Sequence, residues 1–483
     1  MDEQLINAFK DQYGKRVSDA LFERRLYSRD LAPVPALLVK PLFKTVPDLI
    51  VCPINAEEVS DIISMAGKRN IPVTPRAGAS TVYFNSVPVR GGILMDLNQI
   101  KGIISVDEKA QTVTVLAGTA WKDMDDQLQA RGFTACSQPS SAPVATIGGW
   151  FNMVGLGIGS LKFGSLLSQV KEIQVVLPDG SIRTLCSESD PPLSWIAASE
   201  GTLGVVCQLT LKIRPLTPMR HYIIKCPDRQ SMNKALLELP SSPVLPYHVH
   251  FADRSFQHGM YLLGFNPAIV DNACTVGVDY EGSEEELLQA QNSIEQMVKN
   301  LPGSELLAPV MAEHEWKDRY KALRLKRGGP SQLGGEVWLP VKHLASYLGD
   351  IDLLATKYHA PMMSYGEMVN AEYISIMSMF YADESKTIDY ILDLNLVKKI
   401  QDIGYRYGGY PYGVGLWNSP YIKRIYNKAQ LAELKKRKKQ LDPQGIMNPG
   451  KVYGPPLMLN SFNFAIGMYA FGVIQRLRRR GGN

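Results

Sequence analysis

The sequence lacks the cysteine patterns typical of metal-cluster proteins and of secreted proteins. It has six cysteines, and none of them forms a Cys-x-x-Cys pair. This scatter disfavours an iron–sulfur or zinc site built on cysteine and indicates a reducing compartment. The first residues, Met-Asp-Glu-Gln-Leu, do not resemble a secretory signal. We therefore expect a cytoplasmic protein, or one that joins a membrane through a complex.

Strong charge and the common nucleotide-binding signatures are also missing. The net charge is +5 over 483 residues, which makes no case for nucleic acid but is compatible with an anionic substrate. Neither a Walker loop nor a Gly-x-Gly-x-x-Gly turn is present. The length and a hydrophobic content of 45% fit two or three ordinary globular domains.

Glycine is abundant in one stretch, residues 146–164. This stretch contains no proline and has six glycines, at positions 148, 149, 155, 157, 159 and 164. Large apolar residues such as Trp150 and Phe151 lie between them, whereas flexible linkers are polar. The pattern predicts a buried loop that lines a large cofactor, with a surface loop as the alternative.

The region before this stretch predicts a βαβ unit. An apolar strand at 48–52 is followed by Asn55 as a helix N-cap with Glu58 in capping-box position, and by a second strand at 71–74. The small residues of 75–81 come next, and their N–H groups could form a nest for a diphosphate. A plain surface turn is an equally good interpretation of 75–81.

More strands and one helix complete an α+β domain over residues 45–215. The helix is expected at 120–131, and the strands at 91–96, 112–116, 170–177, 181–185 and 208–213. The turn Pro178-Asp179-Gly180 predicts a hairpin between the strands at 170–177 and 181–185.

Several of these segments together carry a family resemblance. They are Pro75–Thr81, Gln138–Ser141, Thr146–Gly149, Lys162–Gly164, Val175–Gly180, Ser199–Gly204 and Leu441–Lys451. In this order and spacing they resemble the PCMH-type FAD-binding domain of the vanillyl-alcohol oxidase family. The resemblance spans about residues 40–454 and is nearest to the FAD-linked D-lactate dehydrogenases and the flavoprotein subunit of glycolate oxidase.

The resemblance implies that FAD binds at positions matching the family motifs. The implied contacts are Pro75, Arg76, Ala77, Gly78, Ala79, Ser80, Thr81, Pro139, Ser140, Ser141, Thr146, Ile147, Gly148, Gly149, Gly157, Gly159, Lys162, Phe163, Gly164, Glu200, Gly201, Thr202, Gly204, Val205, Val206, Asn448 and Lys451. Residues 200–206 would lie near the adenine, and Asn448 and Lys451 near the flavin. Some relatives tether FAD through a histidine, but residues 74–83 contain none, so we predict non-covalent FAD.

The same resemblance sets the expected domain organisation. An N-terminal arm (1–44) precedes the FAD-binding domain (45–215), and a cap domain for the substrate (216–440) follows. A return segment (441–454) and a hydrophobic, basic tail (455–483) complete the chain. In the cap we expect a helix at 284–300 and strands at 244–251, 260–265 and 373–381.

The metal-binding motifs of similar hydroxyacid dehydrogenases are absent. Residues 364–370, Ser-Tyr-Gly-Glu-Met-Val-Asn, stand where His-x-Gly-Asp-Gly-Asn is expected. Pro411 and Tyr412 replace a Glu-His pair. Tyrosine is a poor substitute for imidazole and carboxylate ligands, so we predict no metal.

Without that metal, another group must take the hydroxyl proton while a hydride passes to the flavin N5. The candidates are Tyr412, Tyr365, Glu367, His248 and His250. His248 and His250 share one strand face, although such a pair is more often packed and hydrogen-bonded.

Arg319 and Arg324 lie where relatives place an arginine that binds the substrate carboxylate. A solvated helix face is an equally good interpretation of that segment. Residues 431–440, which include five consecutive basic residues, predict an exposed helix.

The tail suggests a docking segment. Residues 457–474 are mostly apolar, and arginines follow up to 480. They predict an interfacial helix or a segment buried in a partner, with packing on the chain's own domain as the alternative. A partner would suit a flavoprotein without a second redox centre.

Three functions remain open at this point. The first is an FAD-linked dehydrogenase of the D-lactate or glycolate type that passes electrons to a quinone or a partner, such as an iron–sulfur subunit or an electron-transferring flavoprotein. The second is a non-redox flavin transferase resembling alkyl-dihydroxyacetonephosphate synthase, although the cap sequence shows no matching histidine cluster. The third is a non-catalytic flavoprotein that relays electrons within a complex.

Overall fold

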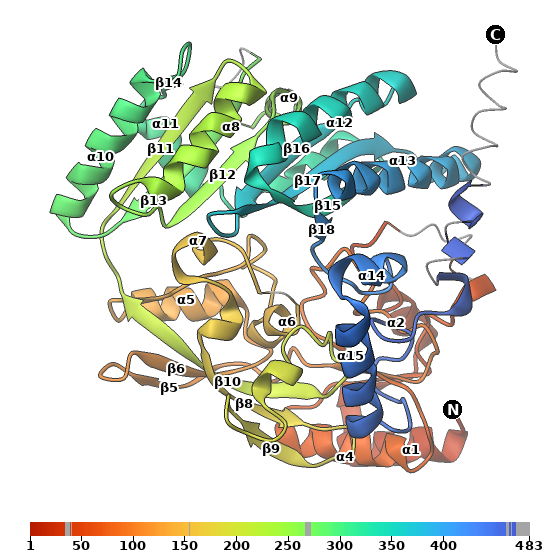
Figure 1. The fold of residues 1–483 in the computed structure, drawn as a ribbon. Helices are drawn as coiled ribbons and strands as arrows, with labels where there is room; N and C mark the ends of the chain where they lie inside the picture. Colours follow the sequence, from red (N-terminus) through yellow and green to blue (C-terminus); the bar gives the residue numbers. More distant parts are fainter. Residues whose placement is uncertain are drawn as a thin grey trace, which may run out of the picture. The chain divides into compact units, whose positions relative to one another are not determined.

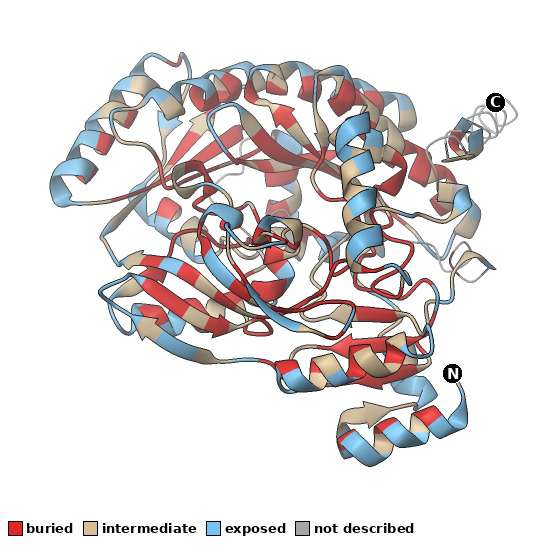
Figure 2. Ribbon diagram, turned by 60° about the horizontal axis from the view of Figure 1, so that its bottom comes forward, coloured by how far each residue is buried: buried red, intermediate tan, exposed pale blue. Residues whose placement is uncertain are grey.

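The computed structural model describes residues 1–33, 39, 41–153, 155–265, 272–459, 463–464 and 466–469. These residues form two compact units (Figure 1). Unit 1 comprises Met1–Gly155, Ser165–Pro215 and Gly413–Ile466. Unit 2 comprises Leu156–Gly164, Leu216–Tyr412 and the residues from Gly467. Figure 2 shows buried strands at the centre of the units and exposed outer faces on their helices.

Unit 1 contains two sheets. Its helices are α1 (Glu3–Tyr13), α2 (Leu21–Leu26), α4 (Ala56–Gly67), α5 (Trp121–Gln129), α6 (Ile147–Phe151), α14 (Ile422–Ile425) and α15 (Lys428–Leu441). Its strands are β1 (Val17–Ser18), β2 (Leu49–Val51), β3 (Val73–Arg76), β4 (Ile93–Asp96), β5 (Ile103–Asp107), β6 (Thr112–Leu116), β7 (Phe133–Ala135), β8 (Val170–Val176), β9 (Ile182–Leu185) and β10 (Val205–Pro215).

The first sheet has the order β1-β2-β4-β3, and its last three strands are parallel. The predicted βαβ unit is present, but β4 lies between β2 and β3, so the two predicted strands are not neighbours. Asn55 caps α4 by accepting from the N–H of Glu58. The carboxylate of Glu58 accepts from the N–H of Ile54 and pairs with Arg16, so only half of the capping box forms.

The second sheet of unit 1 is antiparallel, with the order β5-β6-β10-β8-β9, and β7 pairs with β10. The predicted hairpin is present as β8 and β9, and Gly180 adopts a φ of +85° in its turn. The chain then closes on itself, because the segment at 446–448 returns to β3. Val73 donates to the carbonyl of Ile446, and Asn448 donates to the carbonyl of Val73.

Unit 2 is built on an antiparallel sheet with the order β14-β11-β13-β12-β16-β17-β15-β18. The strands are β11 (Met219–Cys226), β12 (His248–Ala252), β13 (Cys274–Glu281), β14 (Glu305–Leu306), β15 (Ser331–Pro340), β16 (Met363–Met368), β17 (Tyr373–Ala382) and β18 (Tyr410–Pro411). The helices are α7 (Ser160–Phe163), α8 (Arg229–Glu238), α9 (Arg254–Leu262), α10 (Glu284–Lys299), α11 (Pro309–Lys317), α12 (Leu344–Tyr358) and α13 (Thr387–Arg406).

The two faces of this sheet differ. Helices α8, α12 and α13 cover one face (Figure 1). On that face α13 packs closely, because Gly335 of β15 leaves room for Ile400 and Gly404 of α13 leaves room for Val337. The other face carries α11 over β11. It is the face on which the polar residues of the next section lie.

One predicted element is wrong. Residues 260–265 were expected to form a strand, but 260–262 are the last residues of α9. Asp253 caps this helix by accepting from the N–H of Phe256. Phe256 and Met260 then point into the core four residues apart, which is a helical spacing. The apolar run Met-Tyr-Leu-Leu is also typical of a strand, and only the cap at Asp253 identifies it as the end of a helix.

Candidate functional site

Two loops of unit 1 expose backbone N–H groups that have no partner. Within the described part of the chain, the N–H groups of Gly78–Ser80 and Ser140–Ser141 donate no hydrogen bond. The loops touch, because a Cβ at Gly78 would lie only 2.0 Å from the carbonyl oxygen of Val144. Ala79 adopts a φ of +47°, as turns of this kind require. Successive free N–H groups in such turns form a concavity for anions, so these loops can hold a diphosphate.

The flanking residues of the first loop have other tasks. Pro75 and Arg76 end β3, and Arg76 donates through its guanidinium to the carbonyls of Arg29 and Ser86. The Thr81 hydroxyl accepts from the N–H of Tyr83. Arg76 is therefore directed at the N-terminal arm. Of the predicted set, Gly78, Ala79 and Ser80 offer the free donors, Ala77 precedes them, and Pro139 precedes the second pair.

The glycine-rich stretch begins as a short helix whose N–H groups are already used. Thr146 caps α6 by accepting from Gly149, while Ile147 and Gly148 donate to the carbonyls of Thr119 and Ala117. A Cβ at Gly148 would lie 2.7 Å from the Cβ of Ala117, so this glycine is required for packing. Gly149 is exposed. This end of α6 offers a flat surface rather than hydrogen-bond donors.

The second half of the stretch belongs to unit 2. Gly157 donates to the hydroxyl of Ser160, and Gly159, with a φ of +86°, begins α7. Lys162 pairs with Glu281 at 3.4 Å, and Phe163 contacts Tyr247 edge-on. Gly164 ends the helix with a φ of +75°. These residues hold α7 against the sheet of unit 2.

A buried group of polar residues joins three segments of unit 1. The carboxylate of Glu200 accepts from the N–H groups of Val414 and Gly415. Asn448 donates to the carbonyls of Asn85 and Glu200 at 2.9 and 2.8 Å. The expected adenine-side residue Glu200 and the expected flavin-side residue Asn448 are therefore direct neighbours.

Charge within this group is strongly perturbed. Burial lowers the pKa of Lys451 to about 7, although the charges of Asp30 and Glu200 oppose the shift. Burial raises the pKa of Glu200, against the two backbone donors. Lys451 donates to the carbonyl of Val87 and is 2% exposed.

The remaining predicted residues of this region lead from the buried group into β10. Gly201 adopts a φ of +70°, and a Cβ there would lie 2.5 Å from the Cγ of Pro75. The hydroxyl of Thr202 donates to the carbonyl of Ser199. The last members of this set are Gly204, Val205 and Val206, of which the two valines begin β10.

Unit 2 carries a row of polar side chains across five strands. Cross-strand pairing places His221 opposite Asp279 and Asp279 opposite His248, while His250 lies opposite Glu367 and Glu367 opposite Ser375. Directly paired residues point to the same face of a sheet. We call the set His221, Asp279, His248, His250, Glu367 and Ser375 the polar stripe. It lies on the face opposite to α13.

The contacts within the polar stripe are short. Nδ1 of His221 lies 2.7 Å from Oδ1 of Asp279, and Nε2 of His248 lies 3.8 Å from Oε2 of Glu367. Glu315 of α11 adds a contact of 3.1 Å to Nε2 of His250. The rings of His248 and His250 stack at 5.4 Å.

The stripe shifts the pKa of its members in opposite directions. Burial and the charges of His250 and Arg319 hold the pKa of His248 well below its usual value. Burial also acts against His250, but the hydrogen bond and charge of Glu315 outweigh it and raise its pKa to about 9. Burial and the charge of Glu336 raise the pKa of Glu367 to about 8.

The structure separates the two predicted arginines. Arg324 pairs with Asp318 at 3.5 Å and lies over the ring of Phe265. Arg319 lies between the rings of Trp316 and Tyr320, at 4.2 and 4.3 Å. It has no acidic partner within the described part of the chain, and its buried Nε has no acceptor. Arg319 is therefore a fixed positive charge beside the stripe.

The two candidate tyrosines are placed differently. The hydroxyl of Tyr412 donates to the carbonyl of Leu156 at 3.3 Å, and its ring lies 6.1 Å from that of Trp338. Tyr365 of β16 packs on Phe256, and burial raises the pKa of its hydroxyl. Tyr365 and the stripe residue Glu367 are two positions apart on β16, with Gly366 between them. Both side chains therefore point to the same face of the sheet.

Sequence reasoning missed several members of this site. Asp279, His221, Glu315 and Glu336 join it only through strand pairing and helix packing. A signal was present for Asp279, because it is one of two charged residues, with Glu281, in a strand that is buried throughout. The cap does contain a cluster of histidines, contrary to the interpretation of its sequence.

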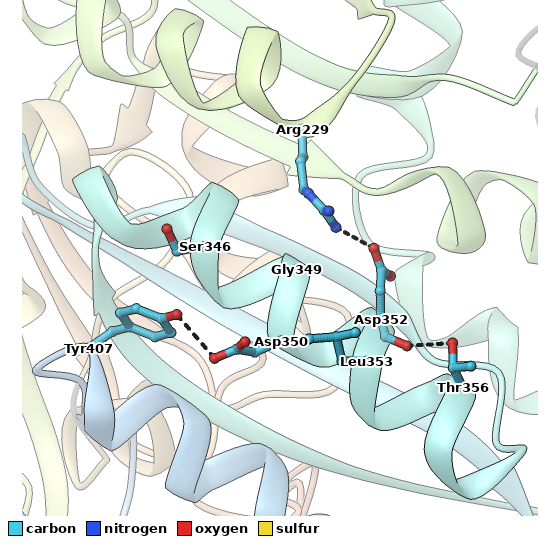
Figure 3. A pocket seen from close by; sticks show the side chains of 8 residues that line it. All are labelled: Arg229, Ser346, Gly349, Asp350, Asp352, Leu353, Thr356 and Tyr407. Atoms are coloured by element: carbon cyan, nitrogen blue, oxygen red, sulfur yellow. Dashed lines mark hydrogen bonds and ion pairs between the residues drawn. The ribbon is translucent and has the colours of Figure 1, made fainter.

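A pocket on the other side of unit 2 carries no comparable chemistry. It lies between α8 and α12 and is lined by Arg229, Ser346, Gly349, Asp350, Asp352, Leu353, Thr356 and Tyr407 (Figure 3). Arg229 is paired with Asp352, and Asp350 accepts from Tyr407 at 3.0 Å. Its charges are satisfied by one another, so we do not assign the function to it.

Most of the predicted docking tail, residues 457–480, lies outside the described residues, and so does the membrane or partner contact predicted for it. Among the described helices, none has the length and apolar character needed to cross a bilayer.

Comparison with known proteins agrees with these features. Residues 47–185 match the family of FAD binding domains, and residues 218–452 match the C-terminal domain of FAD linked oxidases. The chain is 22% identical to glycolate oxidase subunit GlcD of Bacillus subtilis, over 93% of this chain and 96% of that protein. It is 23% identical to the mitochondrial D-lactate dehydrogenase (cytochrome) of Arabidopsis thaliana, over 85% of this chain and 74% of that protein.

The comparisons also include proteins of other activities. Alkyldihydroxyacetonephosphate synthase of Dictyostelium discoideum is 22% identical over 85% of this chain and 74% of that protein. A solved alkyldihydroxyacetonephosphate synthase matches with a TM-score of 0.75, covering 94% of this chain and 86% of that chain. Solved p-cresol methylhydroxylase matches with a TM-score of 0.79 at 14% identity, covering 93% and 96%. The last two likenesses establish the fold.

Both matched regions lie in one chain, in the order of the FAD-linked oxidases, and the free N–H groups of unit 1 suit the diphosphate of FAD. The predicted fold and the FAD cofactor are confirmed. The chain belongs to the vanillyl-alcohol oxidase family of flavoproteins, with a PCMH-type FAD-binding domain and the C-terminal domain of FAD-linked oxidases.

Proposed function

We propose that this chain is an FAD-linked dehydrogenase that oxidises a small 2-hydroxy acid and passes the electrons to a partner subunit or a quinone. The observation that carries the proposal is the polar stripe with Arg319 beside it in unit 2. Arg319 donates to the carbonyl of Trp316 and the hydroxyl of Tyr320, but it has no acidic partner among the described residues and its Nε has no acceptor. Such a guanidinium suits the carboxylate of the substrate, and a carboxylate suits the proton of its hydroxyl. The names of the relatives in Bacillus and Arabidopsis support the same substrate class.

FAD supplies the hydride acceptor, the flavin N5. In unit 1, the free N–H groups of Gly78–Ser80 and Ser140–Ser141 would hold its diphosphate. No histidine stands in residues 74–83, which supports non-covalent binding. The other predicted FAD contacts, among them Lys162, Glu200, Asn448 and Lys451, remain proposals.

In unit 2, we assign the anchoring of the substrate carboxylate to Arg319. Its ring contacts to Trp316 and Tyr320 fix the guanidinium, so little side-chain entropy is lost on binding. Replacing Arg319 by Met should raise KM for the acid about 100-fold, because a charge-assisted hydrogen bond is lost. The exposed Arg327 offers a matched control, and Arg327→Met should leave KM unchanged.

Within the stripe, we assign proton removal to Glu367. Asp279 is held by His221 and Glu315 is held by His250, whereas Glu367 makes, among the described residues, only the 3.8 Å contact to His248. Its side chain is 21% exposed, so a small substrate can reach it. The buried His248 and His250 then orient the substrate hydroxyl.

The test is anaerobic mixing of the purified flavoprotein with D-lactate, glycolate and other 2-hydroxy acids. Bleaching of the flavin absorbance by one of them is the expected result. If no hydroxy acid bleaches the flavin, but a co-purified subunit reduces it, the protein relays electrons and the proposal is wrong.

A second candidate function is a non-redox flavin transferase of the alkyldihydroxyacetonephosphate synthase type. The observation that favours it is the histidine cluster of His221, His248 and His250, together with the match to such a synthase over 85% of this chain and 74% of that protein. A transferase would exchange the acyl group of an acyl-dihydroxyacetonephosphate for a fatty alcohol, with release of the fatty acid and without net flavin reduction. Product formation without an electron acceptor would therefore distinguish it from the dehydrogenase.

A further inference from the structure

The polar stripe contains a group of side chains that meets the needs of a metal ion. One ligand atom each from His248, His250 and Asp279 lies within 4.8 Å of the other two. We propose that these three residues bind one divalent transition-metal ion such as Zn²⁺. This site goes beyond the proposed hydroxy acid chemistry, because metal binding is measured without any substrate.

His250 and Asp279 each have one polar atom held by a second residue and one atom free, and His248 has a carboxylate 3.8 Å from its Nε2. His250 contacts Glu315 through Nε2, His248 contacts Glu367 through Nε2, and Asp279 contacts His221 through Oδ1. Metal-binding histidines typically donate their other ring N–H to a carboxylate in this way. The arrangement therefore already contains the outer partners that orient metal ligands.

The free atoms include buried acceptors that nothing satisfies. Nδ1 of His248 and Oδ2 of Asp279 have no hydrogen-bond partner in the described part of the chain, and their residues are 4% and 3% exposed. Oε2 of Glu315 is a third such atom nearby. An unpaired buried polar atom destabilises the fold, and a cation beside these acceptors removes that cost.

The backbone is shaped to admit the second imidazole. Gly277 of β13 lies directly opposite His250, and a Cβ at this position would lie 2.1 Å from Cε1 and 2.3 Å from Nε2 of the ring. The missing side chain lets the ring of His250 lie flat across β13, two residues from Asp279 on the same strand face. Any other residue at 277 would displace it.

Charge and ligand type select the class of metal. The carboxylates of Asp279 and Glu315 lie beside the site, with the carboxyl group of Glu367 next to them and the guanidinium of Arg319 nearby. Two imidazoles with one carboxylate suit Zn²⁺ and similar first-row ions rather than Mg²⁺ or Ca²⁺. Ligand atoms around a tetrahedral zinc are about 3.4 Å apart, so a contraction of up to about 1.4 Å from the 4.8 Å limit completes the site.

This site does not reuse the positions where the family motifs would place a metal. Residues 364–370 and 411–412 lack those ligands, which is why the sequence predicts none. The histidines at 248 and 250 and the aspartate at 279 lie on β12 and β13 instead. We therefore replace the prediction of no metal with a site on different strands of the same sheet.

The test uses the full chain with FAD bound and without an affinity tag. The protein is stripped with a chelator and titrated with zinc chloride, and bound zinc is counted after gel filtration. We expect one zinc per chain, with the Kd raised at least about 100-fold in His250→Gln and in Asp279→Asn. Gly277→Ala should weaken binding in the same direction. His258→Gln, which removes an exposed imidazole of the same unit, should bind as the native chain does.

Two results would overturn the proposal. One is native protein that binds no zinc at micromolar concentrations, or variants that bind it as tightly as the native chain. The other is X-ray absorption at the zinc edge of the native protein that shows sulfur ligands, because the proposed site has only nitrogen and oxygen. The absorption measurement keeps the test decisive if a variant fails to fold.

Discussion

At the scale of single residues, Glu367 is the side chain on which the proposed chemistry depends most directly. It lies in the middle of the polar stripe, on a central strand. Replacing it by Gln keeps the shape but removes the proton acceptor, so the rate of flavin reduction by the substrate should fall about 10²–10⁴-fold. Stopped-flow absorbance of the flavin measures this rate.

The matched control for that substitution is Glu372→Gln. Glu372 is exposed between β16 and β17, and its loss should not change the rate. An unchanged rate in Glu367→Gln, with FAD still bound, would contradict the assignment of the proton acceptor.

Lys451 makes stability depend on pH. Its pKa is about 7 in the folded chain against 10.5 as the ordinary value, so between these limits the unfolded chain holds more protons. The free energy of unfolding therefore rises with pH in this window, by up to about 1.4 kcal/mol per pH unit. The native chain should gain stability relative to Lys451→Met between pH 7 and 9.

Urea unfolding of both proteins in excess FAD, at pH 7, 8 and 9, measures the difference. Subtracting the free energy of unfolding of Lys451→Met from that of the native chain removes the contributions of the other titrating groups, provided that the substitution leaves them in place. Lys439→Met, on the exposed side of α15, should show no such trend. A difference that falls as pH rises would show that Lys451 is stabilised as a cation.

At the scale of elements, the contact between the loops at 77–81 and 139–145 decides whether the FAD site forms. A methyl group at Gly78 would lie 2.0 Å from the carbonyl of Val144, so the loops must separate. Separation spreads the free N–H groups and should raise the Kd for FAD at least about tenfold in Gly78→Ala. The rise in flavin fluorescence as FAD dissociates on dilution measures this Kd.

Gly67→Ala is the control for that substitution. Gly67 lies in α4, where the new methyl group meets its nearest atom at 3.4 Å, so FAD binding should not change. Stability should rise by about 0.5–1 kcal/mol, because alanine is the better helix residue. Equal FAD affinity in Gly78→Ala and the native chain would contradict the role of the loop contact.

The elements also show what the sequence could predict. Strands bounded by strong turn residues, such as β8 and β9 around Gly180, were predicted closely because the signal is local. The helix at 260–262 was missed because its signal is the cap at Asp253, several residues earlier. The polar stripe could be predicted only in part. His248 and His250 are close in sequence, but Asp279, His221 and Glu315 reach them through pairings between distant segments.

At the scale of the whole molecule, the tail can be tested apart from the catalytic parts. A chain that ends at Pro456 retains the segment at 446–452, which contacts β3 and Asn85. It should keep FAD and its reduction by the substrate, but lose the partner or membrane contact that the apolar and basic residues after 456 suggest. Co-purification with and without the tail measures this. Loss of FAD on truncation would assign the tail to the fold instead.

The return of residues 446–452 to β3 has a consequence for how the protein is made. Val73 and Asn85, near the start of the chain, find hydrogen-bond partners in Ile446 and Asn448, near its end. The last strand of the sheet of unit 2 ends at Pro411, so the ribosome makes that sheet before it makes the segment that completes the flavin domain. We expect the flavin site to close only after residues 446–452 have been made, because Val73 and Asn85 have no access to these partners before then.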